Sequence, residues 1–200
     1  TYRNAPSINK CASAFTQTLD DWIRAGFVAG PFKEPPLQDF RANSLMAIEQ
    51  KDKVRPVLNM SYPKGASFND NVDKDAIRKL TMSSAAEFAR ALTACGRGAK
   101  FAKQDLKDTF KIVPTKTSDL RLKGFRWLKR YFVDKRGIFG EVPIVANFDD
   151  VNETACLITL SWSQIPPALV GRVLDDVDCV APATTTWCEE FVANFREVCR

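Results

Sequence analysis

Two apolar runs near the C-terminal end constrain the fold more than any other feature. They cover residues 169–174 and 177–181, and only Asp175 and Asp176 separate them. Short apolar segments joined by two polar residues predict antiparallel strands in a tight hairpin. Two adjacent carboxylates would then lie at the tip of the hairpin. Because they repel each other unless a cation lies between them, the pair is a candidate metal site.

The rest of the chain predicts a mixture of helices and strands. Apolar residues at helical spacing predict helices, and short apolar or β-branched runs bounded by turn residues predict strands. Ser83 or Ser84 with Glu87 forms a capping-box pattern at the start of the second helix. The predicted helices are residues 12–27, 83–95, 143–162 and 189–198. The predicted strands are residues 45–49, 54–60, 100–104, 110–113, 122–133 with a basic turn inside, 169–174 and 177–181.

The net charge of +5 is unevenly distributed along the chain. Residues 97–136 contain thirteen Lys or Arg and four Asp, whereas residues 141–200 contain ten acidic and three basic residues. A basic segment followed by an acidic one is typical of a protein that binds a polyanion and a cation. Two ordinary solvated surfaces would give the same totals, so charge alone leaves both interpretations open.

The sequence contains no histidine. This excludes nucleophiles activated by histidine, imidazole acid–base chemistry and His-ligated zinc. The six cysteines form no C-x-x-C pair, and no secretory signal opens the chain, so free thiols in a protein of the cytoplasm or nucleus are expected. No apolar run approaches the roughly twenty residues needed to span a bilayer. Catalysis would therefore depend on carboxylates, lysines, thiols or metal ions held by oxygen.

A further acidic residue, Asp105, directly follows the predicted strand 100–104. If this strand lies beside the hairpin, Asp105 joins Asp175 and Asp176 in a cluster of oxygen ligands, which Mg²⁺ prefers. Two such ions about 3.5–4 Å apart form the clamp used in phosphoryl transfer. The other Asp pairs, 20–21 and 149–150, fall inside predicted helices and are interpreted as solvated surface.

The residues around these aspartates resemble reverse transcriptases. Residues 100–114, Lys-Phe-Ala-Lys-Gln-Asp-Leu-Lys-Asp-Thr-Phe-Lys-Ile-Val-Pro, are similar to motif A, in which an aromatic residue follows the metal-binding aspartate by five positions. Residues 173–176, Val-Leu-Asp-Asp, are similar to motif C, which usually begins with tyrosine. Residues 122–127, Tyr131 and residues 138–140 resemble the strand pair and the glycine-containing motif B, and residues 30–32, 40–45 and 61–70 are similar to DIRS-like retrotransposon polymerases.

This resemblance implies an α+β fold, the fingers and palm of a right-hand polymerase. Residues 1–80 and 113–143 would form the fingers, and residues 81–112 and 144–200 the palm. An antiparallel palm sheet would carry the catalytic hairpin and be backed by helices. The thumb would be absent, so the chain is expected to be part of a longer polyprotein.

The resemblance also implies roles for single residues. Asp105, Asp175 and Asp176 would be catalytic and would bind two Mg²⁺ ions, with Mn²⁺ as a substitute. The backbone carbonyl of Leu106 would complete the coordination. Phe110 would lie where a ribose 2′-hydroxyl projects and would select deoxynucleotides.

Further nucleotide-binding roles fall on the first predicted hairpin and on motif B. Arg55, with Lys51 or Lys53, would bind the incoming triphosphate, which needs cations around it as pyrophosphate leaves. Gly140 would let nucleotide or template approach the backbone, although an ordinary turn glycine would serve equally. Ile144 and Val145 stand where the family has Ser-Pro or Ala-Pro, a departure that affects template contacts.

The implied activity is template-directed addition of dNTPs to a primer 3′-hydroxyl by an RNA-directed DNA polymerase. Its partners would be template–primer nucleic acid, bound by the basic segment 97–136 in a salt-sensitive way, and dNTP, without a membrane. One alternative is a viral-type RNA-dependent RNA polymerase core, in which a polar residue would replace Phe110. Another is a catalytically inactive polymerase-like scaffold that binds nucleic acid or protein.

Overall fold

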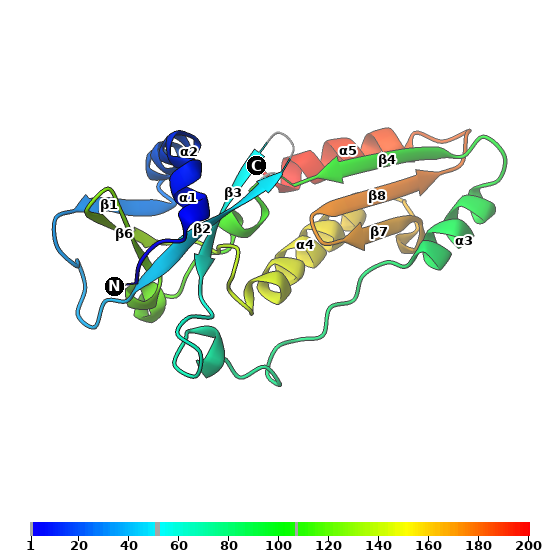
Figure 1. Ribbon diagram of the computed structural model, residues 1–200. Helices are drawn as coiled ribbons and strands as arrows, with labels where there is room; N and C mark the ends of the chain where they lie inside the picture. Colours follow the sequence, from blue (N-terminus) through cyan, green and yellow to red (C-terminus); the bar gives the residue numbers. More distant parts are fainter. Residues whose placement is uncertain (1, 51–52, 107) are drawn as a thin grey trace. The chain divides into compact units, whose positions relative to one another are not determined.

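The computed structural model describes residues 2–50, 53–106 and 108–200. The chain divides into two compact units (Figure 1). Unit 1 comprises residues 1–77 and 110–144, and unit 2 comprises residues 78–109 and 145–200. Each unit has its own sheet and its own core, so the expected mixture of helix and strand is confirmed.

The elements follow one another in a mixed order along the chain. The helices are α1 (Pro6–Lys10), α2 (Ala12–Arg24), α3 (Ala85–Cys95), α4 (Ile144–Ser161) and α5 (Trp187–Val198). The strands are β1 (Val28–Phe32), β2 (Ala42–Gln50), β3 (Lys53–Asn59), β4 (Lys100–Asp105), β5 (Gly124–Trp127), β6 (Arg130–Asp134), β7 (Val170–Val173) and β8 (Asp176–Ala181). Short 3₁₀ helices cover Asn69–Asn71, Thr109–Ile112, Thr117–Leu122 and Pro167–Leu169.

Unit 1 contains a five-stranded sheet in the order β1-β6-β5-β2-β3. Strands β2 and β3 form the predicted first hairpin, while β2 and β5 pair in parallel. Helix α2 is amphipathic and buries Phe15, whose ring packs edge-on against Phe125 and Trp127 of β5. This aromatic cluster joins the helix to the sheet and forms the centre of the core of unit 1.

Unit 2 contains a three-stranded antiparallel sheet in the order β4-β8-β7. Side chains alternate between the two faces of a strand, and residues opposite each other share a face. One face carries Val177 and Cys179, which belong to a core shared with Phe191 and Phe195 of α5. Helices α4 and α5 lie behind the sheet in the view of Figure 1. The other face carries the side chains of Asp105 and Asp176, which are opposite each other in register.

Local signals explain where the helices of unit 2 begin and end. Ser84 caps α3: its hydroxyl accepts the backbone N–H of Glu87, and the Glu87 carboxylate accepts the backbone N–H of Ser84. The predicted capping box is thus confirmed. Gly96, with φ of 75°, ends the helix in a conformation that glycine adopts without strain. Helices α4 and α5 confirm the predictions over residues 143–162 and 189–198.

Two sequence predictions in unit 1 are wrong. The predicted first helix extends to residue 27, but α2 ends at Arg24, and residues 28–32 form the edge strand β1. The pairing of β1 with β6 is irregular between Ala29 and Phe32. This stretch contains Pro31, a residue type that edge strands tolerate. The strand predicted at 110–113 is a 3₁₀ turn. Asp108 has a φ of 54°, and the N–H of Val113 donates to the carbonyl of Phe110, so local hydrogen bonding replaces the sheet ladder.

Charged side chains also lie inside unit 1. Lys111 and Asp134 form a buried ion pair, and the Lys111 ammonium lies 4.0 Å from the centre of the Trp22 ring. Lys123, which is 1% exposed, donates to the Glu141 carboxylate at 2.7 Å. Because an unpaired charge is very unfavourable in a core, each pair fixes the segments that carry it. Within the described residues, no helix is apolar enough over a sufficient length to cross a membrane.

We expect Asp134→Asn to lower the free energy of unfolding by about 3–5 kcal/mol, because it leaves the buried Lys111 without its counter-charge. Chemical denaturation followed by circular dichroism measures this change. Asp21→Asn is the matched control, since the Asp21–Arg24 pair is solvent-exposed and should contribute less than about 1 kcal/mol. Equal effects of the two substitutions would contradict the structural role of the buried pair.

Candidate functional site

The pairing of β4 with β8 brings together two acidic segments that are distant in the sequence. Asp105, the last residue of β4, lies opposite Asp176, the first residue of β8. Cα atoms of residues opposite each other in antiparallel strands are about 4.5–5.5 Å apart. One residue further on, the N–H of Leu106 donates to the carbonyl of Asp175 at 3.1 Å. The backbones of the three predicted metal-binding aspartates therefore lie next to one another at one end of the paired strands β4 and β8.

The turn of the hairpin is shifted by one residue from its predicted position. Val173 pairs with Asp176, so the loop consists of Leu174 and Asp175 rather than of the two aspartates. Leu174 has a φ of 53°, whereas no positive φ occurs at Asp175. A positive φ at the first loop residue is typical of a type II′ turn, where glycine is usual. A leucine in this conformation costs about 1–3 kcal/mol, which the surrounding structure must offset.

Sequence reasoning missed a lysine among these carboxylates. The Lys103 ammonium donates to the carboxylate of Asp176 at 2.6 Å. Lys103 also lies opposite Asp178, so both share the sheet face of Asp105 and Asp176. The hydrogen bond that Lys103 donates to Asp176 raises the pKa of Lys103, so the ammonium is charged at neutral pH. Alternation along β4 and β8 was the available signal, since Lys103 and Asp105, like Asp176 and Asp178, are two residues apart.

A fourth carboxylate, Asp178, lies on the same face. One of its oxygens is buried and has no hydrogen-bond partner among the described residues. Burial raises the pKa of Asp178, Lys103 opposes this change, and Asp176 adds to it. Lys103 is thus the cation that partly neutralises a concentrated negative charge on this face.

The donor set fits a hard cation in its chemistry. Carboxylate and carbonyl oxygens are the ligands that Mg²⁺ prefers, and all the predicted ligands are of this kind. Across the described residues, however, no group of three or more Asp, Glu or Cys side chains is close enough to hold an ion. Asp176 is paired with Lys103, and the carbonyl of Leu106 accepts the hydroxyl of Thr109 at 2.9 Å. The backbone brings the predicted ligands together, while the Asp176 carboxylate and the Leu106 carbonyl are hydrogen-bonded to other partners.

Three of the predicted nucleotide-binding residues lie in unit 1, around a residue that sequence reasoning missed. The ring of Phe139 packs against Phe110, with 4.7 Å between the ring centres. The guanidinium carbon of Arg55 lies 5.4 Å from the centre of the Phe139 ring, at the distance of a cation–π contact. Phe139 is 40% exposed and lies within residues 138–140, the segment that resembles motif B, but no separate role was predicted for it.

Gly140 is required by the packing of unit 1 itself. Its φ is 105°, and a Cβ atom added there would lie 2.1 Å from the carbonyl oxygen of Leu58. The side chain of Asn69 donates to the carbonyl of Gly140 at 2.7 Å. Of the two lysines predicted to assist Arg55, Lys51 lies outside the described residues, and for Lys53 only its place in β3 is described.

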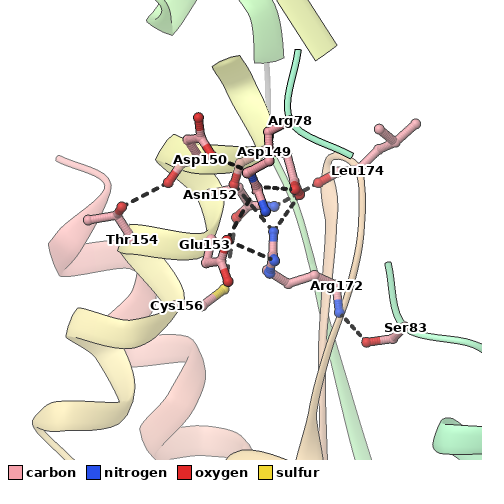
Figure 2. Close-up of polar contacts among 10 residues, drawn as sticks. All are labelled: Arg78, Ser83, Asp149, Asp150, Asn152, Glu153, Thr154, Cys156, Arg172 and Leu174. Atoms are coloured by element: carbon pink, nitrogen blue, oxygen red, sulfur yellow. Dashed lines mark hydrogen bonds and ion pairs between the residues drawn. The ribbon is translucent and has the colours of Figure 1, made fainter. Parts of the chain in front are cut away.

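The interpretation of the pair 149–150 as a solvated surface is wrong for its first member. The side chain of Asp149 is 1% exposed and accepts from Arg78 at 2.6 Å and from Arg172 at 2.5 Å. Figure 2 shows the acidic side chains of α4 around the two guanidinium groups. Asp149 is buried because it lies on the face of α4 that is turned toward β7. Its partners are remote in the sequence, so helical periodicity alone could not identify them.

Part of the basic segment 97–136 has a structural role. Lys111 and Lys123 are buried in ion pairs, and Lys103 is engaged by Asp176. Exposed basic side chains remain in both units and are the ones available to a polyanion: Arg97, Lys116, Arg121, Arg126, Lys129, Arg130 and Lys135. All six cysteines are free thiols, as expected.

The fold is similar to that of solved foamy virus protease-reverse transcriptases. The foamy virus enzyme in complex with an RNA/DNA hybrid matches 99% of the present chain with a TM-score of 0.70 and 16% identity. A complex with double-stranded DNA matches 100% of the chain with a TM-score of 0.69 and 18% identity. A mutant of the prototype foamy virus protein matches 98% with a TM-score of 0.67 and 17% identity.

These matches cover only part of the foamy virus proteins. The chain spans 24%, 37% and 23% of the three matched chains, respectively. No protein-family model and no curated protein sequence matches the chain. At such low identity the likeness concerns the fold, and it gives no evidence of particular closeness to DIRS-like elements. The chain thus has a reverse transcriptase-like fold.

Proposed function

We propose that the chain is the fingers and palm of an RNA-directed DNA polymerase that adds dNTPs to a primer 3′-hydroxyl on a nucleic-acid template. The pairing of Asp105 with Asp176, beside the Leu174–Asp175 turn, supports this most strongly. It brings the backbones of three aspartates from two distant segments to one end of the sheet of unit 2. The foamy virus proteins of similar fold were solved in complexes with double-stranded DNA and with an RNA/DNA hybrid, which supports nucleic acid as the partner.

In this proposal, unit 2 provides the metal ligands. Asp105, Asp175 and Asp176 would hold two Mg²⁺ ions with the carbonyl of Leu106. The ions would activate the primer 3′-hydroxyl and stabilise charge on the leaving pyrophosphate. Lys103 would have to release Asp176 before both Asp176 oxygens could serve as ligands. Until then its ammonium limits the repulsion among the carboxylates.

Unit 1 would bind the nucleotide. Arg55 would bind the triphosphate, where a fixed guanidinium stabilises negative charge that develops on the phosphates. Its contact with Phe139 restricts the side chain before the ligand arrives. Phe110, which packs against Phe139, would exclude the ribose 2′-hydroxyl.

A viral-type RNA polymerase is the second candidate within the same fold, and an inactive scaffold is the third. The aromatic residue at position 110 favours DNA synthesis, since a polar residue is expected there in an RNA polymerase. Asp105, Asp175 and Asp176 favour an active enzyme, because a scaffold has no need for three carboxylates at one sheet edge.

We expect the protein to extend a primer with dNTPs in preference to rNTPs in the presence of Mg²⁺. Asp175→Asn should lower incorporation by at least about 10³-fold, because it removes a charged metal ligand. Gel-based primer extension, with the chain and with any longer polypeptide that contains it, measures both. Asp20→Asn, in the exposed Asp pair of α2, is the control. A preference for rNTPs would indicate an RNA polymerase. Binding of template–primer without incorporation would indicate a scaffold.

Lys103→Met should increase the affinity for Mn²⁺ about two- to fivefold, since it removes a competing cation from Asp176. Electron paramagnetic resonance measures free Mn²⁺ directly in such a titration. Lys100→Met is the matched control, because Lys100 lies on the same strand and pairs with Glu189 instead. A weaker affinity in Lys103→Met would show that the ammonium supports the site rather than competing for it.

Phe110→Val should raise rNTP use relative to dNTP use by about 10- to 200-fold, because it opens space for a 2′-hydroxyl. Single-nucleotide incorporation with matched dCTP and rCTP measures the ratio. Phe101→Val, at an exposed position of unit 2, should leave the ratio unchanged. An unchanged ratio in Phe110→Val would contradict the role of Phe110 in sugar selection.

A further inference from the structure

The Leu174–Asp175 turn has a conformation that its sequence does not favour. Leu174 has a positive φ, where glycine would be the usual residue. The same turn carries Asp175 and leads directly into Asp176. A contact from another element of unit 2 must therefore stabilise the backbone conformation of the turn.

The side chain of Asn152 is in direct contact with this turn. Asn152 lies on α4, is 0% exposed, and donates its amide N–H to the carbonyl of Leu174 at 2.7 Å (Figure 2). A buried amide is unfavourable unless it is hydrogen-bonded, so the contact also satisfies Asn152. No role was predicted for Asn152 from the sequence.

A second hydrogen bond, with Cys156, sets the orientation of the Asn152 amide. The thiol of Cys156, one turn further along α4, lies 3.9 Å from the Asn152 side-chain oxygen and donates to it. Burial raises the pKa of Cys156 to about 12, so the thiol keeps its proton. With the oxygen turned toward Cys156, the amide nitrogen faces the Leu174 carbonyl.

The strand before the turn is bound to the same face of α4. Arg172 donates to Asp149, and its guanidinium lies 3.6 Å from the carboxylate of Glu153. Asp149, Asn152 and Glu153 are three and four positions apart and therefore project from one side of the helix. The N–H of Ser83 donates to the carbonyl of Arg172, and the N–H of Arg172 donates to the hydroxyl of Ser83, which limits movement of β7.

We propose that Asn152 is a positioning residue that holds the Leu174–Asp175 turn and thereby places Asp175 and Asp176, with the Arg172–Asp149 pair fixing α4 against β7. The role of the turn in metal binding rests on the function proposed above. The contact between Asn152 and the turn does not depend on that function.

Hydrogen exchange at the Leu106 amide tests the proposal without reference to activity, because this N–H donates to the carbonyl of Asp175. In Asn152→Leu, which has a similar volume but no donor, exchange should be at least about tenfold faster. Asn147→Leu is the matched control: it makes the same change on the same helix at an exposed position, and exchange should stay within about twofold of the parent rate.

Leu174→Gly provides a rescue that a general loss of stability would not show. Glycine adopts a positive φ without strain, so the turn should need Asn152 less. In the Leu174→Gly background, Asn152→Leu should change Leu106 exchange by less than about threefold. If Asn152→Leu does not fold, Asn152→Ser replaces it, since the serine hydroxyl is too short to reach the Leu174 carbonyl.

Parent-like exchange in Asn152→Leu, or a loss that Leu174→Gly does not rescue, would overturn the proposal. In an active protein, Asn152→Leu should also lower Mn²⁺ affinity and kcat about tenfold while the KM for dNTP changes less. A parent protein that neither binds Mn²⁺ nor extends primers would overturn the proposed function. The exchange experiment would still decide the role of Asn152.

Discussion

The antiparallel pairing of β4 with β8 is the contact on which the candidate metal site depends. It sets Asp105 opposite Asp176 and extends past the strand ends through the bond from the Leu106 N–H to the Asp175 carbonyl. A shift of one residue would move every side chain of β4 to the opposite face. Such a shift would expose the buried residues and separate the carboxylates. The core of unit 2 therefore enforces the register that the site requires.

The three Asp-Asp pairs of the chain show how strongly surroundings decide the role of a carboxylate. Both members of the pair on α2 are exposed. On α4, Asp149 is buried between two arginines, while Asp150 stays at the surface. In the hairpin, Asp175 lies in the turn and Asp176 starts a strand beside Lys103. Composition and spacing are the same in all three pairs, so only their partners distinguish them.

Basic residues of the chain are found both in the interior and on the surface. Lys111 and Lys123 are buried in unit 1. Their burial is tolerated because the carboxylates of Asp134 and Glu141, respectively, pair with them. Lys103 lowers the repulsion among acidic side chains on the open sheet face of unit 2. The surface available to a polyanion is consequently smaller than the basic segment 97–136 indicates.

The sequence by itself determined most of the local structure: the capping box at Ser84, helix α4, and both hairpins follow from periodicity and turn residues that act over a few positions. It also indicated which three aspartates could cooperate. Only the tertiary structure decided the exact turn residues, the burial of Asp149, the pairing of Lys103 with Asp176, and the contacts of Phe139 and Asn152. Each of these depends on a partner far away in the sequence or on the face that a core makes available. Periodicity records which side of an element is apolar, but it does not record what lies opposite.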